Sequence, residues 1–135
     1  VNLPLPVGVG DAGFARLLAE VLTPLAERFA PQLILVSAGY DAHWRDPLAG
    51  LHLSLAGYWQ LAKGLVALAE RLCAGRLVVV LEGGYDLEVL ALGVADTCRA
   101  LLGDVEPRPD RIGASAWPEA SLERLIAGIR KTHAL

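Results

Sequence analysis

Chemically active side chains are concentrated in two short segments of this sequence. Residues 37–50 read SAGYDAHWRDPLAG and bring two carboxylates, an imidazole and two aromatic rings into one connection. Residues 81–85 read LEGGY and place a phenol directly behind two glycines. Glycine lets a backbone approach a ligand closely, and an exposed tyrosine hydroxyl can donate a hydrogen bond to a carbonyl oxygen. The two segments are therefore the candidate site.

Each candidate segment directly follows a short apolar run. Leu33–Val36 and Leu77–Leu81 are unbroken runs of this kind, typical of strands that are covered on both faces. Capping residues and helical spacing of the polar positions predict helices around them, at about residues 11–29, 54–74, 87–102 and 119–131. Strands that alternate with helices predict an α/β fold with an open parallel sheet and helices on both faces.

Specific residues are expected to begin, bend and end these helices. Asp11 is a plausible N-cap of the first helix, and Pro24 predicts a kink or a break within it. Ser54 is the expected N-cap of the second helix, which Gly75 ends. In parallel α/β sheets the ligand site lies beyond the carboxyl ends of the strands, so both candidate segments are expected to meet there.

Length and first residue bear on the domain organisation. The 135 residues suit a single domain. Strands that are apolar on both faces need neighbours on both sides, which two strands cannot provide, so we expect further strands outside this sequence. The chain begins with Val and contains no Met, which favours a start inside a longer protein.

Composition excludes several classes of function. A formal charge of −3 gives no basic field for a phosphate backbone, so no direct nucleic-acid contact is expected. No apolar run approaches the roughly 20 residues that cross a bilayer, and no signal peptide is recognisable, so no membrane contact and a cytoplasmic location are predicted. Two cysteines far apart predict neither a disulfide framework nor a thiolate metal site.

At these segments the sequence resembles the histone deacetylase superfamily, which includes bacterial acetoin-utilisation proteins and acetylpolyamine amidohydrolases. The resemblance extends over about residues 1–103 and is strongest for the class II and bacterial branch. It rests on the order and spacing of five motifs, namely NLPL at 2–5, GD at 10–11, SAGYDAH at 37–43, DPL at 46–48 and LEGGY at 81–85.

The resemblance implies an arginase/deacetylase-like fold and a hydrolase that removes acetyl or related acyl groups from lysine or polyamine amines. Asp41 matches the aspartate that ligates the family's catalytic zinc, and Tyr85 matches the tyrosine that polarises the acyl carbonyl. Leu48 and Gly83 match positions that line the acyl-lysine channel. A zinc ion with an open coordination position and a phenol opposite it suit hydrolysis of an amide.

The sequence departs from the family pattern in its histidines. The family's remaining zinc ligands form an Asp-x-His pair and its general bases form a tandem histidine pair, whereas this sequence has only His43, His52 and His133 in neither arrangement. We therefore interpret residues 1–135 as the C-terminal part of one deacetylase-like α/β domain, with the core motifs in 1–103 and a tail and last helix in 104–135. The isolated chain is expected to be inactive.

The sequence leaves several residues and functions open. Asp46 is expected to form a turn or a cap. His43 is expected to lie beside the metal ligands or at the rim of the site, with a role as a metal ligand as the less favoured alternative. Trp44 and Arg45 are also expected at that rim. The alternative functions are a non-catalytic fragment, which could form a homo-oligomer through unpaired strand edges, and a small α/β interaction module, which the two-sided apolar strands disfavour.

Overall fold

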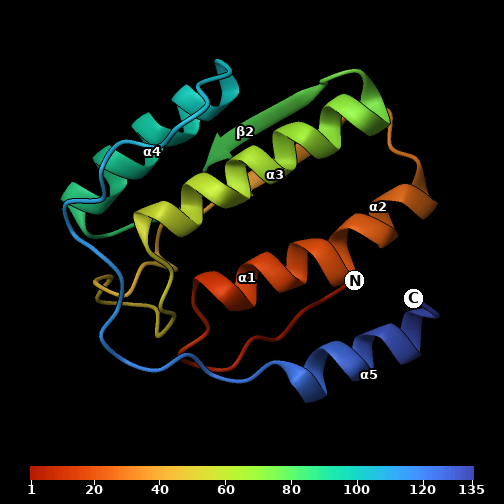
Figure 1. Ribbon diagram of the computed structural model, residues 1–135, viewed down its shortest axis with the longest axis horizontal. Helices are drawn as coiled ribbons and strands as arrows, with labels where there is room; N and C mark the ends of the chain where they lie inside the picture. Colours follow the sequence, from red (N-terminus) through yellow and green to blue (C-terminus); the bar gives the residue numbers. More distant parts are fainter.

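The computed structural model describes residues 1–135 and contains a parallel pair of strands (Figure 1). Strand β1 spans Ile34–Ala38 and strand β2 spans Leu77–Leu81, joined by helix α3 over Leu55–Cys73. The register pairs Ile34 with Leu77 and Ala38 with Leu81. Both predicted strands are confirmed, and β1 continues two residues beyond the predicted end.

The helices of this chain cover one face of the strand pair. Val36 and Val79 border an interior space of about 180 Å³ whose other walls come from α1, α3 and helix α4, which spans Leu87–Leu101. Leu35 and Val80, which point the opposite way in the pleat, are exposed. The α/β class and the parallel pairing are as predicted, while the second face of the pair is bare in these 135 residues.

The first helical segment changes its winding ahead of a proline. Helix α1 spans Asp11–Leu17, the π-helical turn η1 spans Leu18–Leu22, and helix α2 spans Thr23–Phe29. Pro24 has no backbone N–H, and its ring would clash with the carbonyl oxygen four residues earlier in a regular α-helix. A wider turn before the proline relieves that conflict. The chain thus stays helical through Pro24, and the kink or break predicted there takes the form of a π turn.

Asp11 does not cap the first helix, so that prediction is wrong. Gly10 is the N-cap residue and has no side chain to offer. The Asp11 carboxylate instead accepts hydrogen bonds from the backbone N–H of Ser54 at 2.8 Å and from its hydroxyl at 2.5 Å. This bond lies at the start of α3, so Asp11 ties α1 to α3.

The cap of α1 comes from a residue distant in sequence. The Glu119 carboxylate accepts hydrogen bonds from the N–H groups of Gly10, Ala12 and Gly13 at 3.3, 3.1 and 3.0 Å. Glu119 was expected to start the last helix, but helix α5 spans Glu123–His133. A carboxylate at a helix N-terminus satisfies free N–H groups and the positive end of the helix dipole, so Glu119 fastens the tail to α1.

A hydrophobic core joins α5 to the first helical segment. Helix α5 runs beside α1 and α2 in Figure 1, on the side away from α3. The buried residues of this core come from the N-terminal segment, α1, η1, the N-cap of α5 and α5 itself, and they are Val9, Leu17, Val21, Leu122, Ile126 and Ile129.

No helix of the chain is both long and apolar enough to cross a membrane.

Helices α3 and α4 begin with side-chain caps. Ser54 caps α3 as predicted, because its hydroxyl accepts a hydrogen bond from the Gly57 N–H at 3.1 Å. The Asp86 carboxylate caps α4 by accepting from the N–H groups of Glu88 and Val89, both at 3.1 Å. Gly75, with φ of 75°, follows the end of α3 as predicted. These caps fix where the loops before α3 and α4 end.

Candidate functional site

The two candidate segments meet at one edge of the strand pair. Both follow the carboxyl ends of parallel strands, which must lie at the same edge. The Tyr40 N–H donates to the Gly83 carbonyl oxygen at 2.8 Å, and the Glu82 N–H donates to the Ala38 carbonyl oxygen at 3.0 Å. The predicted convergence of the β1–α3 and β2–α4 loops is therefore confirmed by direct hydrogen bonds.

The Asp41 carboxylate lies between a glycine of each loop. A Cβ atom on Gly39 would lie 2.7 Å from Asp41 Oδ1, and a Cβ atom on Gly83 would lie 2.7 Å from Asp41 Oδ2. Side chains at either position would collide with the carboxylate. Other side chains of this loop make hydrogen bonds, whereas the Asp41 carboxylate makes none; they are Tyr40, His43, Trp44, Arg45 and Asp46. The Asp41 oxygens remain available as metal ligands.

Tyr85 presents its phenol to solvent while its backbone is fixed. The side chain is 54% exposed, and the backbone N–H donates to Asp46 Oδ2 at 2.8 Å. Gly84 precedes it with φ of 131°, and a Cβ atom there would lie 2.9 Å from the Tyr40 Cβ. Both the left-handed backbone and the close packing require glycine at position 84. The Gly-Gly pair thus brings Tyr85 to the same edge as Asp41.

The two residues expected to line a substrate channel lie in different surroundings. Gly83 lies beside the Asp41 carboxylate, because a Cβ atom at this position would lie 2.7 Å from Asp41 Oδ2. Leu48 is 71% exposed, and its backbone N–H donates to Asp46 Oδ1 at 2.9 Å. The 135 residues do not enclose a channel around the Leu48 side chain.

His43 is a buried residue of the loop, so the rim position considered for it is wrong. Its ring is fully buried and stacks on Trp44, with ring centroids 5.6 Å apart. Nδ1 accepts the Arg45 N–H at 3.1 Å, and Nε2 has no hydrogen-bond partner. Burial lowers the pKa of His43, an effect that the negative charge of Asp110 partly opposes. The imidazole is therefore neutral at neutral pH.

Trp44 and Arg45 are engaged by other parts of the chain. The Trp44 indole Nε1–H donates to the Gly113 carbonyl oxygen at 2.9 Å. The Arg45 guanidinium forms ion pairs with Asp86 at 2.9 Å and with Glu88 at 3.0 Å, both at the start of α4. These contacts connect the β1–α3 loop to the tail and to α4.

Two tyrosines connect the β1–α3 loop to helices α3 and α4. The role of Tyr58 was not predicted. The Tyr58 hydroxyl, on α3, donates to the Gly39 carbonyl oxygen at 3.2 Å, and burial strongly raises its pKa. The Tyr40 hydroxyl donates to Thr97 Oγ1 on α4 at 2.8 Å. The two rings pack with centroids 5.1 Å apart. A tyrosine one turn into a predicted helix, beside a candidate loop, was the available signal for Tyr58.

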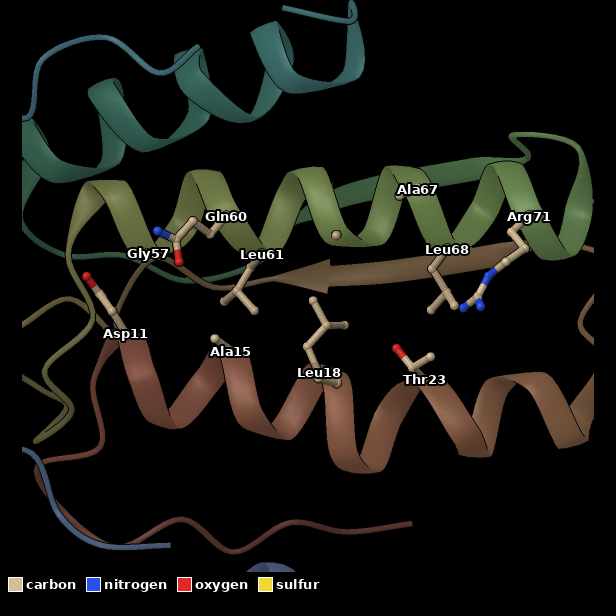
Figure 2. A pocket seen from close by; sticks show the side chains of 12 residues that line it. Asp11, Ala15, Leu18, Thr23, Gly57, Gln60, Leu61, Ala67, Leu68 and Arg71 are labelled. Carbon is tan, nitrogen blue, oxygen red and sulfur yellow. The ribbon is translucent and has the colours of Figure 1, made fainter. Parts of the chain in front are cut away.

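A groove between α1–α2 and α3 has a volume of about 380 Å³ but does not include the candidate residues (Figure 2). Its wall is mostly small or aliphatic, and its charged residues already have partners. Asp11 binds Ser54, and Arg71 pairs with Glu27 at 2.6 Å. The groove therefore offers no group that is free to react.

The residues of the candidate site supply one possible zinc ligand, Asp41. Nowhere in the chain do three or more His, Cys, Asp or Glu side chains gather in a group that could hold a metal ion. Asp41 is a carboxylate at a strand end with its oxygens free, which suits a catalytic zinc site that takes carboxylate and imidazole ligands. The other ligands of such a site are not among the neighbours of Asp41 in these residues.

Comparison with known proteins places these loops in a family context. The histone deacetylase domain family matches residues 1–101. Histone deacetylase 14, a chloroplastic protein of Arabidopsis thaliana, is 54% identical over 104 residues, which are 77% of this chain and 25% of that protein. Human polyamine deacetylase HDAC10 is 40% identical over 126 residues, which are 93% of this chain and 18% of that protein.

Solved structures give the same result for the fold. The HDA15 HD domain superposes with a TM-score of 0.78 at 29% identity, covering 97% of this chain and 34% of that one. The histone deacetylase Clr3 gives a TM-score of 0.80 at 26% identity, covering 97% of this chain and 21% of that one. The chain thus spans about a quarter or less of these two curated relatives, the Arabidopsis and human proteins. With three quarters of its length matched by the family and both site loops carrying the motifs, the chain belongs to the histone deacetylase family.

Proposed function

We propose that these residues form the C-terminal part of a zinc-dependent amidohydrolase that removes acetyl or related acyl groups from lysine or polyamine amines. Family membership supports a deacetylase in general terms. One relative acts on polyamines according to its name, and others are named histone deacetylases, so both amine classes are candidate substrates. In this proposal residues 1–103 contribute the site and residues 104–135 brace it.

The placement of Asp41 between the two loops carries the proposal. Gly39 and Gly83 each leave room for one oxygen of the carboxylate, so two glycines on separate loops are needed for one side chain. Tyr85 follows Gly83 by two residues at the same edge of the strand pair. This arrangement sets a possible metal ligand and a hydrogen-bond donor on adjacent loops, as amide hydrolysis requires.

The proposal assigns a role in the reaction to each residue of the candidate site. Asp41 would supply one carboxylate ligand to zinc, and a bound zinc ion supplies Lewis-acid polarisation of the acyl carbonyl and activation of water. The Tyr85 phenol would donate a hydrogen bond to the carbonyl oxygen as negative charge develops on it. Gly83 keeps the space beside Asp41 open, and Leu48 would contact the aliphatic part of the acyl-amine.

The 135-residue chain by itself should not turn over substrate. Hydrolysis at zinc needs three protein ligands and a base, and this chain offers Asp41 alone. Its bare strand face, which includes Leu35, Val78 and Val80, is expected to promote self-association. Sedimentation and metal analysis of the isolated chain test this point, and a monomer with one zinc per chain that deacetylates acetyl-lysine would contradict it.

The direct test uses the product of the complete open reading frame that encodes these residues. Asp41→Ala should abolish deacetylation of acetyl-lysine peptides and acetylated polyamines and sharply reduce zinc content. Glu106→Ala, which removes an exposed carboxylate in the tail, is the matched control and should change neither. A zinc content near one per chain in Asp41→Ala would contradict the ligand assignment.

A second variant tests the oxyanion donor. Tyr85→Phe should lower kcat on the order of 100-fold with little change in KM, because the phenol acts on charge that develops in the transition state. A change of only a few-fold would mean that Tyr85 packs without taking part in the chemistry.

The cytoplasmic location stays a prediction of the sequence, and two relatives are named chloroplastic.

A further inference from the structure

One buried carboxylate connects the two loops of the candidate site. Asp46 lies in the β1–α3 loop and is 6% exposed. Its Oδ1 atom accepts the Leu48 N–H at 2.9 Å, and its Oδ2 atom accepts the Tyr85 N–H at 2.8 Å. The first bond is the turn that the sequence predicted for Asp46. The second reaches the loop after β2, 39 residues later, and was not predicted.

The bond to Tyr85 holds the backbone at the residue that follows the Gly-Gly pair. Gly83 and Gly84 precede Tyr85, and glycine has more conformational freedom than any other residue. Asp86 caps α4 immediately after it, so the chain is fixed on that side. The Tyr85 side chain is 54% exposed, so the direction of the phenol depends on how its backbone is held. The Asp46 bond therefore restrains the backbone from which the phenol projects, between the Gly-Gly pair and the capped helix.

We propose that Asp46 is a positioning residue that orients the Tyr85 phenol toward the substrate carbonyl. The inference rests on the proposed role of Tyr85 as oxyanion donor. Hydrogen bonds to an ionised carboxylate are stronger than neutral ones, and this carboxylate is shielded from water. The Arg45 ion pairs also join the two regions, but the Arg45 side chain is 33% exposed and such pairs contribute little.

The variant Asp46→Asn removes one of the two acceptor oxygens with minimal change of shape, and Asp46→Ala removes both. An amide has one acceptor oxygen in place of two, so it can accept only one of the two N–H groups and turns its NH₂ toward the other. Asp110→Asn is the control, because Asp110 also uses both oxygens to accept backbone N–H groups, from Ile112 and Gly113 at Oδ1 and from Ala56 at Oδ2, and does not touch Tyr85.

The experiment measures kcat and KM for the product of the complete open reading frame in a double-mutant cycle. Asp46→Asn should lower kcat on the order of 10-fold with KM little changed, since a misplaced donor loses transition-state stabilisation. In a Tyr85→Phe background the same substitution should lower kcat less than about twofold, because the donor is already gone. Asp110→Asn should leave kcat within about twofold of wild type in both backgrounds.

The outcomes separate this inference from the proposed function. If Tyr85→Phe alone keeps wild-type kcat, the proposed role of Tyr85 fails and this inference fails with it. If Tyr85→Phe is impaired but Asp46→Asn lowers kcat equally in both backgrounds, or neither Asp46→Asn nor Asp46→Ala lowers kcat, only the positioning role is overturned. Should Asp46→Asn not fold, Asp46→Glu replaces it, since it keeps both acceptors but moves them by one methylene, and the same cycle decides.

Discussion

A methyl group added at Gly83 provides a demanding test of the site geometry. The Cβ of Gly83→Ala would lie 2.7 Å from Asp41 Oδ2 and 3.2 Å from Asp41 Cγ. Gly83 is not among the glycines with positive φ, so alanine fits its backbone conformation without strain. The main consequence of the substitution is therefore a push on the Asp41 carboxylate.

The size of the effect follows from the distances. Ordinary contact begins at 3.4 Å, so the carboxylate or the loop must move by about 0.7 Å. Catalytic groups must be held within about 0.5 Å, and a displacement of about 1 Å can reduce the rate on the order of 100-fold. We therefore expect Gly83→Ala to lower kcat/KM by roughly 10-fold to 100-fold and to weaken zinc binding.

The assay is deacetylation and metal content of the product of the complete open reading frame. Gly128→Ala on α5 is the control, since a Cβ there meets nothing within 4 Å. It should leave activity unchanged and raise stability by up to about 1 kcal/mol, because alanine favours a helix more than glycine does. Wild-type activity and zinc content in Gly83→Ala would refute the placement of Asp41 as a ligand beside this glycine.

Three further predictions concern stability. Glu119→Gln should destabilise the chain by about 1 kcal/mol, because it removes the negative charge that caps α1, and an unchanged thermal midpoint would contradict that cap. Asp86→Ala should cost about 1 kcal/mol at neutral pH. Since the Val89 N–H lowers the Asp86 pKa, this difference should shrink as pH falls below the ordinary value of 3.8, and a constant difference in denaturant titrations would contradict it. Burial raises the pKa of Tyr40 and Tyr58, so stability should fall as pH rises above about 10, where unfolded phenols ionise. Ultraviolet titration should show these two phenols ionising at higher pH in the folded than in the unfolded chain, and equal ionisation in both states would refute their burial.

Local signals in the sequence were sufficient to predict most of the elements. The run Leu77–Leu81 forms β2 with those bounds, and Ser54 caps α3, because apolar runs and capping side chains act within a few residues. The convergence of the two loops also followed, since parallel strands place their carboxyl ends at one edge. The shared location of Asp41 and Tyr85 at this edge could thus be inferred from the sequence alone.

Contacts between distant segments were beyond the reach of local patterns. Glu119 was expected to begin α5, yet its carboxylate caps α1, more than 100 residues away in sequence. Asp11 was expected to cap α1, yet its carboxylate accepts hydrogen bonds from Ser54. Asp46 was correctly expected to form a turn, but its second oxygen also accepts a hydrogen bond from the Tyr85 N–H on another loop. Each of these carboxylates has several donors compatible with its chemistry, and only tertiary packing selects among them.

Anomalous diffraction at the zinc edge, from crystals of the product of the complete open reading frame, tests the central claim most directly. We predict a zinc peak about 2.0–2.2 Å from a carboxylate oxygen of Asp41, with the Tyr85 phenol facing the open coordination position. Zinc-replete crystals in which every zinc peak lies away from Asp41 would contradict the account.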